Sequence, residues 1–469
     1  MGGFFGVVGH EDCVADLFYG TDYHSHLGNM CGGLLVKDKN DGLCRIIHRL
    51  RHDQFRAKFD GDLEKLHGNS GIGCISDSDS QPLIIKCKFG SFGITTVGLI
   101  SNLDELQNDA LQNHNAHYVE MYGNDVSPTE LVARLISLKD NFADGIQYAQ
   151  DKIKGSCSML ILAEDGALIA ARDRWGRTPI VLGEKDGAYA AAFESCSLYN
   201  LGYKILRWLG PGEVVRMTPD SITTILPPRK QMKFCAFLWI YYGFPASSYE
   251  NINVEHARYN CGAMLAKRDK GLEVDTIAGI PDSGTAHALG YANESHVPYM
   301  RSYVKYTPTW ARSFISDRQD QRLHVAKMKL IPILDFIKGK KLLFCEDSIV
   351  RGTQLRDTFA RLPELGAKEV HMRSACPPIM YGCKYLNFSP SRTPMELIAR
   401  RAVAKLEGSS DAHLDEYTDS STCRYKKMIE SIRKEMGLAS LKYQTFDDMI
   451  KAIGFPKEKL CTYCWNGKE

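Results

Sequence analysis

Hydrophobic and polar positions follow two different patterns along this chain, and the change falls near residue 230. Before it, short apolar runs rich in β-forming residues are separated by glycine turns, which predicts many strands and few helices. The clearest strands are 158–163, 167–171 and 188–193, with an Asp165-Gly166 hairpin turn between the first two. The clearest helix, 129–138, has Leu131, Leu135 and Leu138 on one side. We therefore predict a sheet-rich α+β domain over residues 1–230.

After a proline-rich boundary at 226–230, amphipathic helices alternate with short apolar strands such as 276–280 and 341–345. This alternation predicts an α/β domain over residues 231–469, with a parallel sheet and ligands at the carboxyl ends of its strands. The polar stretch 405–440 is expected to form surface helix.

Composition limits the possible classes of protein. The chain has 469 residues, which suggests two large domains, and a net charge of +2, which gives no reason to expect a nucleic acid or an anionic membrane as partner. No apolar run reaches the roughly 20 residues that span a bilayer. The N-terminus lacks the basic start and long apolar core of a signal peptide, so we expect a cytoplasmic protein.

The segment 341–353 carries the most specific chemical signal. An apolar strand ends in Glu346 and Asp347, a loop of small, hydroxyl and glycine residues follows, and 354–362 predicts a helix. The loop and helix start would bind an anion through backbone N–H groups, whereas the acids suit ribose hydroxyls and hydrated Mg²⁺. We expect the acids on a surface loop at the strand end. The segment resembles the 5-phosphoribosyl-1-pyrophosphate (PRPP) motif of type I phosphoribosyltransferases; an ordinary strand–turn–helix is the alternative.

The 15 cysteines are scattered, and a disulfide scaffold is not expected. Most are expected to be buried as small apolar side chains. The exception is the pair Cys461 and Cys464, because a CxxC pair can hold zinc or an iron–sulfur cluster, or act in redox chemistry.

Other segments extend the resemblance over nearly the whole chain. They are 6–11, 172–179, 194–196, 211–213, 237–241, 280–284, 290–292, 376–379 and 396–399. Together they resemble the glutamine phosphoribosylpyrophosphate amidotransferase family of purine synthesis. The resemblance implies an N-terminal nucleophile hydrolase-like domain, which would hydrolyse glutamine, followed by a type I phosphoribosyltransferase domain. It also implies purine nucleotide effectors and a homo-oligomer.

The resemblance implies roles for particular residues. Those expected to bind PRPP are Asp282, Ser283, Lys305, Arg312, Lys329, Glu346, Asp347, Ser348, Val350, Arg351, Gly352 and Thr353. Ser283, Glu346 and Asp347 would also hold Mg²⁺, and Lys305, Arg312 and Lys329 would bracket a mobile lid. Leu238, Phe244 and Ala246 replace polar residues of the family, which puts the affinity for regulators or acceptor in doubt.

The resemblance also implies a role for the terminal cysteine pair, as ligands of an iron–sulfur cluster. Its members with an iron–sulfur cluster carry four cysteines that correspond to Cys235, Cys383, Cys461 and Cys464. Four thiolates suit a [4Fe–4S] cluster, and zinc would accept the same ligands.

The glutaminase half departs from the family at four roles. Gly2 stands where the family has its nucleophilic cysteine, 71–76 lacks an arginine, 96–98 lacks the oxyanion asparagine, and Pro128 replaces an aspartate. We therefore expect no glutaminase activity. Cys13 and Cys74 are the remaining candidate nucleophiles.

Two classes of function stay open. The first is an enzyme that transfers ammonia, or another amine, to PRPP and releases pyrophosphate. The second is a non-catalytic sensor of PRPP or nucleotides that regulates a true amidotransferase.

Overall fold

The structure is a computed structural model that describes residues 2–38, 42–50, 53–113, 117–122, 125–306, 330–386 and 393–468. The chain forms two compact units. The first unit comprises Met1–Cys235, Ser247–Glu250 and Lys384–Phe388, and the second comprises Ala236–Ala246, Asn251–Cys383 and Ser389–Glu469. The helices that the structure describes are too short or too polar to span a bilayer.

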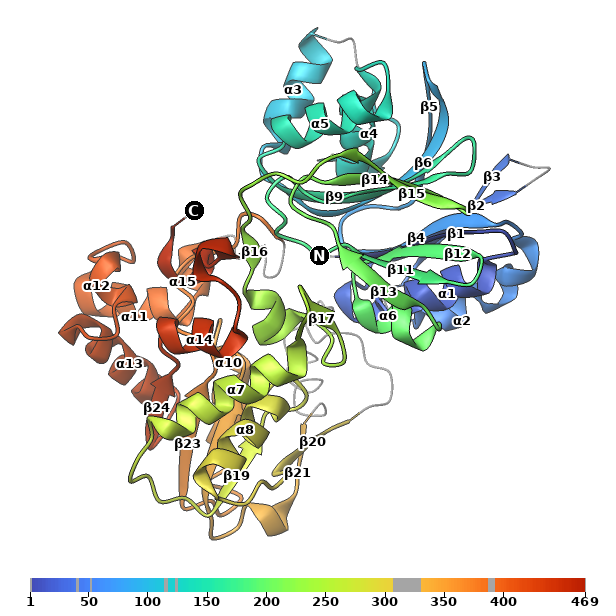
Figure 1. Ribbon diagram of the computed structural model, residues 1–469. Helices are drawn as coiled ribbons and strands as arrows, with labels where there is room; N and C mark the ends of the chain where they lie inside the picture. The colour runs from blue at the N-terminus through green and yellow to red at the C-terminus, as the bar shows by residue number, and fades with distance from the viewer. Residues whose placement is uncertain are drawn as a thin grey trace. The chain divides into compact units, whose positions relative to one another are not determined.

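The first unit is built on two antiparallel sheets (Figure 1). The seven-stranded sheet has the order β13-β11-β12-β1-β4-β2-β3, and the six-stranded sheet has the order β15-β14-β10-β9-β6-β5. The strands of the former are β1 (Gly3–Gly9), β2 (Cys31–Asp38), β3 (Gly42–Arg49), β4 (Ser70–Ser76), β11 (Val181–Lys185), β12 (Ala188–Ala192) and β13 (Lys204–Trp208). Those of the latter are β5 (Leu83–Cys87), β6 (Gly90–Ile100), β9 (Gly155–Ala163), β10 (Leu168–Ala171), β14 (Val214–Thr218) and β15 (Ser221–Leu226).

The two sheets pack face to face, and helices cover their outer faces. A Cβ atom on Gly6 of β1 would lie 3.0 Å from side-chain carbons of Leu160 and Leu168, so the sheets approach closely there. Helices α1 (Val14–Asp22), α2 (Phe55–Phe59) and α6 (Ser195–Asn200) share one core with the seven-stranded sheet. Helices α3 (Leu103–Asn113), α4 (Pro128–Ser137) and α5 (Phe142–Lys152) share another with the six-stranded sheet. The result is a four-layered unit with two cores.

The second unit contains the parallel sheet that the alternation predicts, in the order β19-β22-β23-β24. Its strands are β19 (Thr276–Gly279), β22 (Lys341–Glu346), β23 (Glu369–Ser374) and β24 (Ser440–Tyr443). β20 (Tyr303–Lys305) and β21 (Leu330–Pro332) form a separate antiparallel pair. The helices are α7 (Val254–Lys267), α8 (Thr285–Ser295), α10 (Thr353–Ala360), α11 (Ile398–Glu407), α12 (Leu414–Thr418), α13 (Cys423–Glu435), α14 (Phe446–Ile453) and α15 (Tyr463–Asn466).

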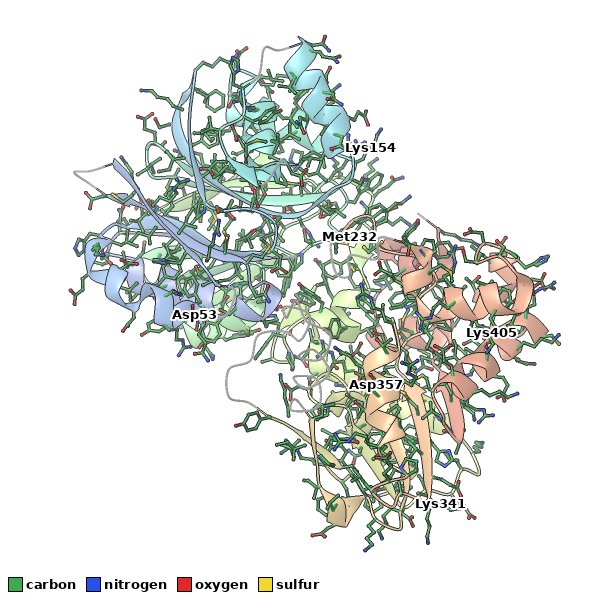
Figure 2. The ribbon with its side chains drawn as sticks, turned by 180° about the vertical axis from the view of Figure 1, so that it is seen from behind. Asp53, Lys154, Met232, Lys341, Asp357 and Lys405 are labelled. Atoms are coloured by element: carbon green, nitrogen blue, oxygen red, sulfur yellow. The ribbon has the colours of Figure 1, made fainter. Side chains whose placement is uncertain are left out.

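Strand β22 is central, and its side chains alternate between the two faces of the sheet. Phe344 packs against Phe359 of α10, with ring centroids 5.3 Å apart, in a core shared with α11 and α13. On the other face, α8 packs against β19 and β22. Figure 2 labels Lys341 at the start of β22 and Asp357 on α10. β22 is thus buried on both sides, which explains its continuous apolar sequence.

Two details of the predicted elements differ from the structure. Leu131 and Leu135 of α4 are buried as expected, but Leu138 follows the helix and is 38% exposed. The stretch 405–440 is not purely surface helix, because Met428 and Ile432 of α13 are buried in the core of the second unit. Met428 and Ile432 recur at helical spacing within a strongly charged sequence. The high charge content suggested an exposed helix, but this spacing places the two residues on one buried face.

Candidate active site

The carboxyl end of β22 places two acidic side chains next to each other. Glu346 is 5% exposed and Asp347 is 4% exposed, because β22 lies between β19 and β23. Glu346 Oε1 accepts hydrogen bonds from the Ser283 hydroxyl at 2.7 Å and from the Asp347 backbone N–H at 3.0 Å. The expectation that these acids lie on a surface loop is therefore wrong: the strand end is enclosed by its neighbours.

This pair of acids concentrates negative charge in a buried place. Burial and the adjacent Asp347 carboxylate raise the pKa of Glu346 well above its usual value. Among the described residues, no Lys, Arg or His forms an ion pair with either carboxylate. Two uncompensated oxygen ligands suit Mg²⁺, which binds one or two carboxylates and completes its shell with waters and phosphates. The described residues contain no group of three or more His, Cys, Asp or Glu that could hold a metal alone.

The segment after the acids forms a turn into a helix. The Ser348 hydroxyl donates to Asp347 Oδ1 at 2.5 Å, and the Val350 carbonyl accepts from the Ile398 N–H at 2.8 Å. Gly352 has a φ of 72°, a left-handed conformation that favours glycine, and it precedes Thr353 at the start of α10. The first N–H groups of a helix have no carbonyl partner earlier in the helix, so a turn that leads into a helix start is a suitable place for an anion.

A second loop, between β19 and α8, lies against the end of β22. The Ile280 N–H donates to the Cys345 carbonyl at 3.0 Å. A Cβ atom on Gly284 would lie 2.3 Å from that same carbonyl oxygen, so only glycine permits this approach. The loop carries Asp282 and Ser283, and the Ser283 contact with Glu346 joins the two loops into one site.

The basic residues predicted for the site have different outcomes. Lys305 Nζ lies 2.7 Å from Asp282 Oδ2, so the structure brings these two together. Arg351 is exposed and pairs with Glu396. Arg312 and Lys329 lie outside the described residues.

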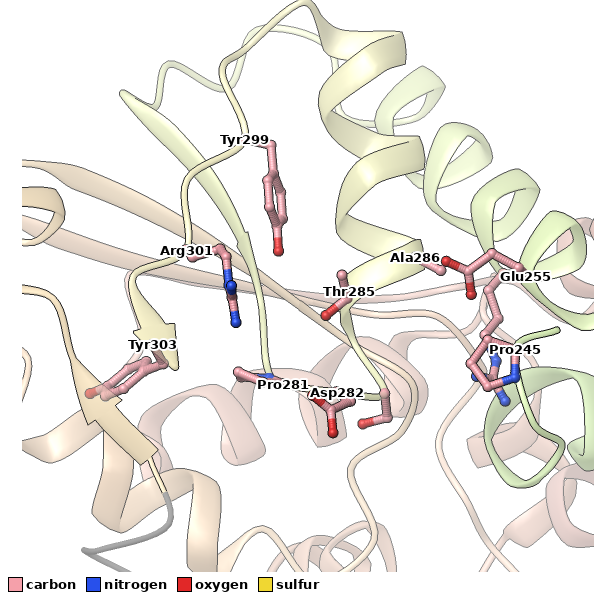
Figure 3. A pocket seen from close by; sticks show the side chains of 11 residues that line it. Pro245, Glu255, Pro281, Asp282, Thr285, Ala286, Tyr299, Arg301 and Tyr303 are labelled. Atoms are coloured by element: carbon pink, nitrogen blue, oxygen red, sulfur yellow. The ribbon is translucent and has the colours of Figure 1, made fainter. Parts of the chain in front are cut away.

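A cavity of about 390 Å³ opens beside the loop that carries Asp282 (Figure 3). It lies within the second unit, and its lining residues are Pro245, Glu255, Arg258, Pro281, Asp282, Ser283, Thr285, Ala286, Tyr299, Arg301 and Tyr303. The sequence pointed to Asp282 and Ser283 but missed Tyr299 and Arg301. Their alternating positions after α8 were the available signal.

The departures in the glutaminase half can be placed in the first unit. Gly2 is buried, and a Cβ atom on it would lie 2.3 Å from the Ile75 carbonyl oxygen, far closer than van der Waals contact allows. Gly98 lies in β6 with a φ of 148°, and a Cβ there would lie 2.0 Å from the Ser156 carbonyl oxygen. Pro128 occupies the first turn of α4, which Ser127 caps by accepting from the Glu130 N–H at 3.2 Å.

A buried polar network adjoins this region, and sequence reasoning missed it. Asp79, only 2% exposed, accepts hydrogen bonds from Ser78 at 2.7 Å, Gln81 at 2.7 Å and Ser127 at 2.6 Å. The Thr129 N–H at 3.2 Å and the Ser76 hydroxyl at 3.4 Å bring the donors to five. These donors satisfy both carboxylate oxygens, so Asp79 holds the start of α4 in place and is not a substitute for the acid missing at Pro128.

The two candidate replacement nucleophiles are poorly placed for attack. Cys13 is 5% exposed and Cys74, within β4, is 1% exposed. Burial raises the pKa of both thiols, which disfavours the reactive thiolate.

Within the second unit, backbone hydrogen bonds join segments next to the predicted cluster cysteines. Ala236, next to Cys235, donates its N–H to the Cys461 carbonyl at 3.2 Å. Met380 and Tyr381, shortly before Cys383, donate theirs to the Cys464 carbonyl at 2.9 and 3.0 Å. The donor set is therefore close in the backbone, although the described side chains do not converge on a metal position.

The three residues that replace polar family residues differ in exposure. Leu238 is fully buried, whereas Phe244 and Ala246 are exposed. An apolar side chain therefore stabilises the core only at the first of these positions.

An N-terminal nucleophile hydrolase-like fold, joined to a type I phosphoribosyltransferase fold with a buried acid pair, defines the class of this protein. A family model described as a glutamine amidotransferase domain matches residues 69–199. The amidophosphoribosyltransferase of Pyrococcus horikoshii is 31% identical, over 94% of this chain and 90% of the relative. That of Methanocaldococcus jannaschii is 29% identical, over 100% of this chain and 97% of the relative.

Solved structures of the same family superpose closely on this chain. Glutamine PRPP amidotransferase from B. subtilis, complexed with ADP and GMP, superposes with a TM-score of 0.84 at 29% identity, covering 99% of this chain and 96% of that one. A structure described as the allosteric regulatory enzyme of purine biosynthesis gives a TM-score of 0.83. The chain belongs to the amidophosphoribosyltransferase family, whose members are pentosyltransferases of purine biosynthesis.

The raised pKa of Glu346 predicts a pH dependence of stability in the ligand-free protein. A carboxyl whose folded pKa exceeds its unfolded value of about 4.3 stabilises the fold at low pH. That contribution is lost as the pH rises through the folded pKa. We expect Glu346→Gln to melt at a higher temperature than wild type above neutral pH, and the difference to shrink toward pH about 4.

Differential scanning calorimetry across this pH range measures the effect. Glu364→Gln, at an exposed position of the same unit, is the matched control and should follow wild type. A Glu346→Gln curve parallel to wild type at every pH would contradict the prediction.

Proposed function

We propose that this protein transfers ammonia, or another small amine, to PRPP with release of pyrophosphate, and that it does not hydrolyse glutamine. Glu346 and Asp347 would bind the ribose hydroxyls, directly or through Mg²⁺, and the turn from Ser348 to Thr353 would bind the 5-phosphate. Mg²⁺, held with Ser283, would supply charge neutralisation for the diphosphate. One observation carries the proposal: two buried carboxylates that form no ion pair among the described residues stand at the end of β22, and residues 348–352 lead from them through Gly352 (φ of 72°) into α10.

The absence of glutamine hydrolysis is supported by packing as well as by residue identity. A nucleophilic cysteine needs space for its side chain, and the backbone around Gly2 leaves no room even for a Cβ atom. Asp79 is satisfied by its own neighbours, and the buried Cys13 and Cys74 cannot take over the role.

Purified protein should release no glutamate from glutamine above a buffer blank, with or without PRPP. Pyrophosphate release from PRPP should nevertheless occur with ammonium, and the same assay with glutamine alone should stay at background. Gly2→Cys should remain inactive with glutamine, because its side chain would collide with Ile75. Glutamate production by wild type would overturn this part of the proposal.

The buried acid pair predicts a large effect on PRPP binding. Asp347→Asn keeps the shape but removes a charge that the cation requires, so we expect Mg·PRPP to bind at least about tenfold more weakly, roughly 1.4 kcal/mol. The melting temperature should not fall, because the substitution relieves repulsion with Glu346.

Calorimetric titration measures this affinity. Asp357→Asn is the matched control, since Asp357 is 52% exposed on α10 and pairs with Arg356. Unchanged affinity in Asp347→Asn would refute the assigned role.

Binding of PRPP by wild type without any turnover on ammonium would instead favour a sensor that regulates a true amidotransferase. Titration with ADP and GMP, which the B. subtilis structure contains, tests purine nucleotides as effectors.

We also propose a [4Fe–4S] cluster on Cys235, Cys383, Cys461 and Cys464. The proposal is supported by the number of thiols and by the backbone hydrogen bonds that bring their segments together. Anaerobically purified protein should be brown and contain about four irons per chain, and Cys461→Ser should lose iron. Cys423→Ser, an exposed cysteine elsewhere in the second unit, should retain it. A colourless protein with one zinc would contradict the cluster.

A further inference from the structure

The cavity beside Asp282 is bordered by a segment whose side chains are ordered by the parallel sheet. The Met300 N–H donates to the Ile277 carbonyl at 2.8 Å, and the Ile277 N–H donates to the Pro298 carbonyl at 2.9 Å. The segment therefore runs beside β19 in extended form, and alternate residues face the same side. Tyr299, Arg301 and Tyr303 all line the cavity, as this alternation requires (Figure 3).

The cavity contains one cation without a partner in the described structure. The buried Arg258 donates to the Trp239 carbonyl at 2.9 Å and to the Gly243 carbonyl at 2.8 Å. Lys305, two residues beyond Tyr303, pairs with Asp282. Within the described ranges, the exposed Arg301 guanidinium has neither a hydrogen bond nor an ion pair.

The carboxylates of the cavity do not compensate Arg301. Asp282 is paired with Lys305, and Glu255 lies at the opposite end of the view, beside Ala286 and Pro245 (Figure 3). Tyr299 and Arg301 line the same part of the cavity (Figure 3), and the Arg301 charge opposes the rise that burial causes in the pKa of Tyr299. The Arg301 end of the cavity is thus positive.

Further hydrogen-bond donors line the same cavity. Tyr299 and Thr285 contribute hydroxyl groups. In the first turn of α8 the Thr285 N–H donates to the Asp282 carbonyl at 3.2 Å, whereas the N–H groups of Ala286 and His287 have no acceptor among the described residues. A guanidinium, hydroxyls and a helix N-terminus together match the oxygens of a phosphate group.

We propose that Arg301 binds the diphosphate group of PRPP, together with the first turn of α8. The inference rests on the proposed function, because the Pro281–Gly284 loop already joins the cavity to the acid pair through Ser283 and Glu346. Arg301 supplies a planar fork that fits two oxygens of one phosphate. Arg301 is therefore a second cation, besides Lys305, near the loop that carries Asp282.

Titration calorimetry with inorganic pyrophosphate and Mg²⁺ tests the proposal. We expect Arg301→Leu to raise the dissociation constant about tenfold, and Arg301→Lys to raise it less because the charge remains. Lys451→Met is the control, since it removes an exposed cation from α14 of the same unit and should change nothing. Steady-state assays with ammonium should show Arg301→Leu raising KM for PRPP more than it lowers kcat. Melting curves check that each variant folds.

The possible outcomes separate this inference from the function on which it rests. Equal pyrophosphate affinity in wild type and Arg301→Leu would overturn the role of Arg301 and leave the transferase proposal standing. A wild type that binds neither PRPP nor pyrophosphate would overturn both. An equal loss of affinity for inorganic phosphate and for pyrophosphate would show a general anion contact and overturn the diphosphate assignment.

Discussion

Two like charges held side by side at the end of a buried strand are the constraint on which the second unit depends. Glu346 and Asp347 stay in place because β22 is hydrogen-bonded on both sides, to β19 and to β23. Their repulsion is only partly relieved by Ser283 and by one backbone N–H, and the cost appears as the raised pKa of Glu346. Such a site is less stable empty than filled, so the same electrostatic strain that opposes folding favours a cation and hydroxyl groups.

A buried acid in the first unit shows the opposite arrangement. Asp79 is as inaccessible as Glu346, yet five donors surround it. Its hydrogen bonds are all used within the fold, so it stabilises the start of α4 and leaves nothing for a ligand. The number of donors per buried carboxylate therefore distinguishes a structural acid from one that is available for binding.

The fold of the first unit does not depend on the positions on which the proposed absence of glutamine hydrolysis rests. On the outer face of each sheet, helices and strands share a core of buried residues, and position 2 belongs to neither of these cores. Gly2, which stands where the resemblance places a cysteine, packs against the Ile75 carbonyl oxygen, where a side chain would collide. Stability and catalysis thus rest on different residues, which allows a unit to persist after its reactive groups are replaced.

The sequence by itself determined the classes of both units, because periodicity distinguishes antiparallel strands with turns from alternating helices and strands. The pattern of an apolar strand followed by acids and a glycine loop also pointed to Glu346 and Asp347, and the family resemblance pointed to Ser283. Only the tertiary structure decided that the acids are buried, that Met428 and Ile432 belong to a core, and that Gly2 has no room for a side chain. It also placed Arg301 and Asp282 in the lining of one cavity. Each of these depends on contacts between residues far apart in the chain, which local patterns do not encode.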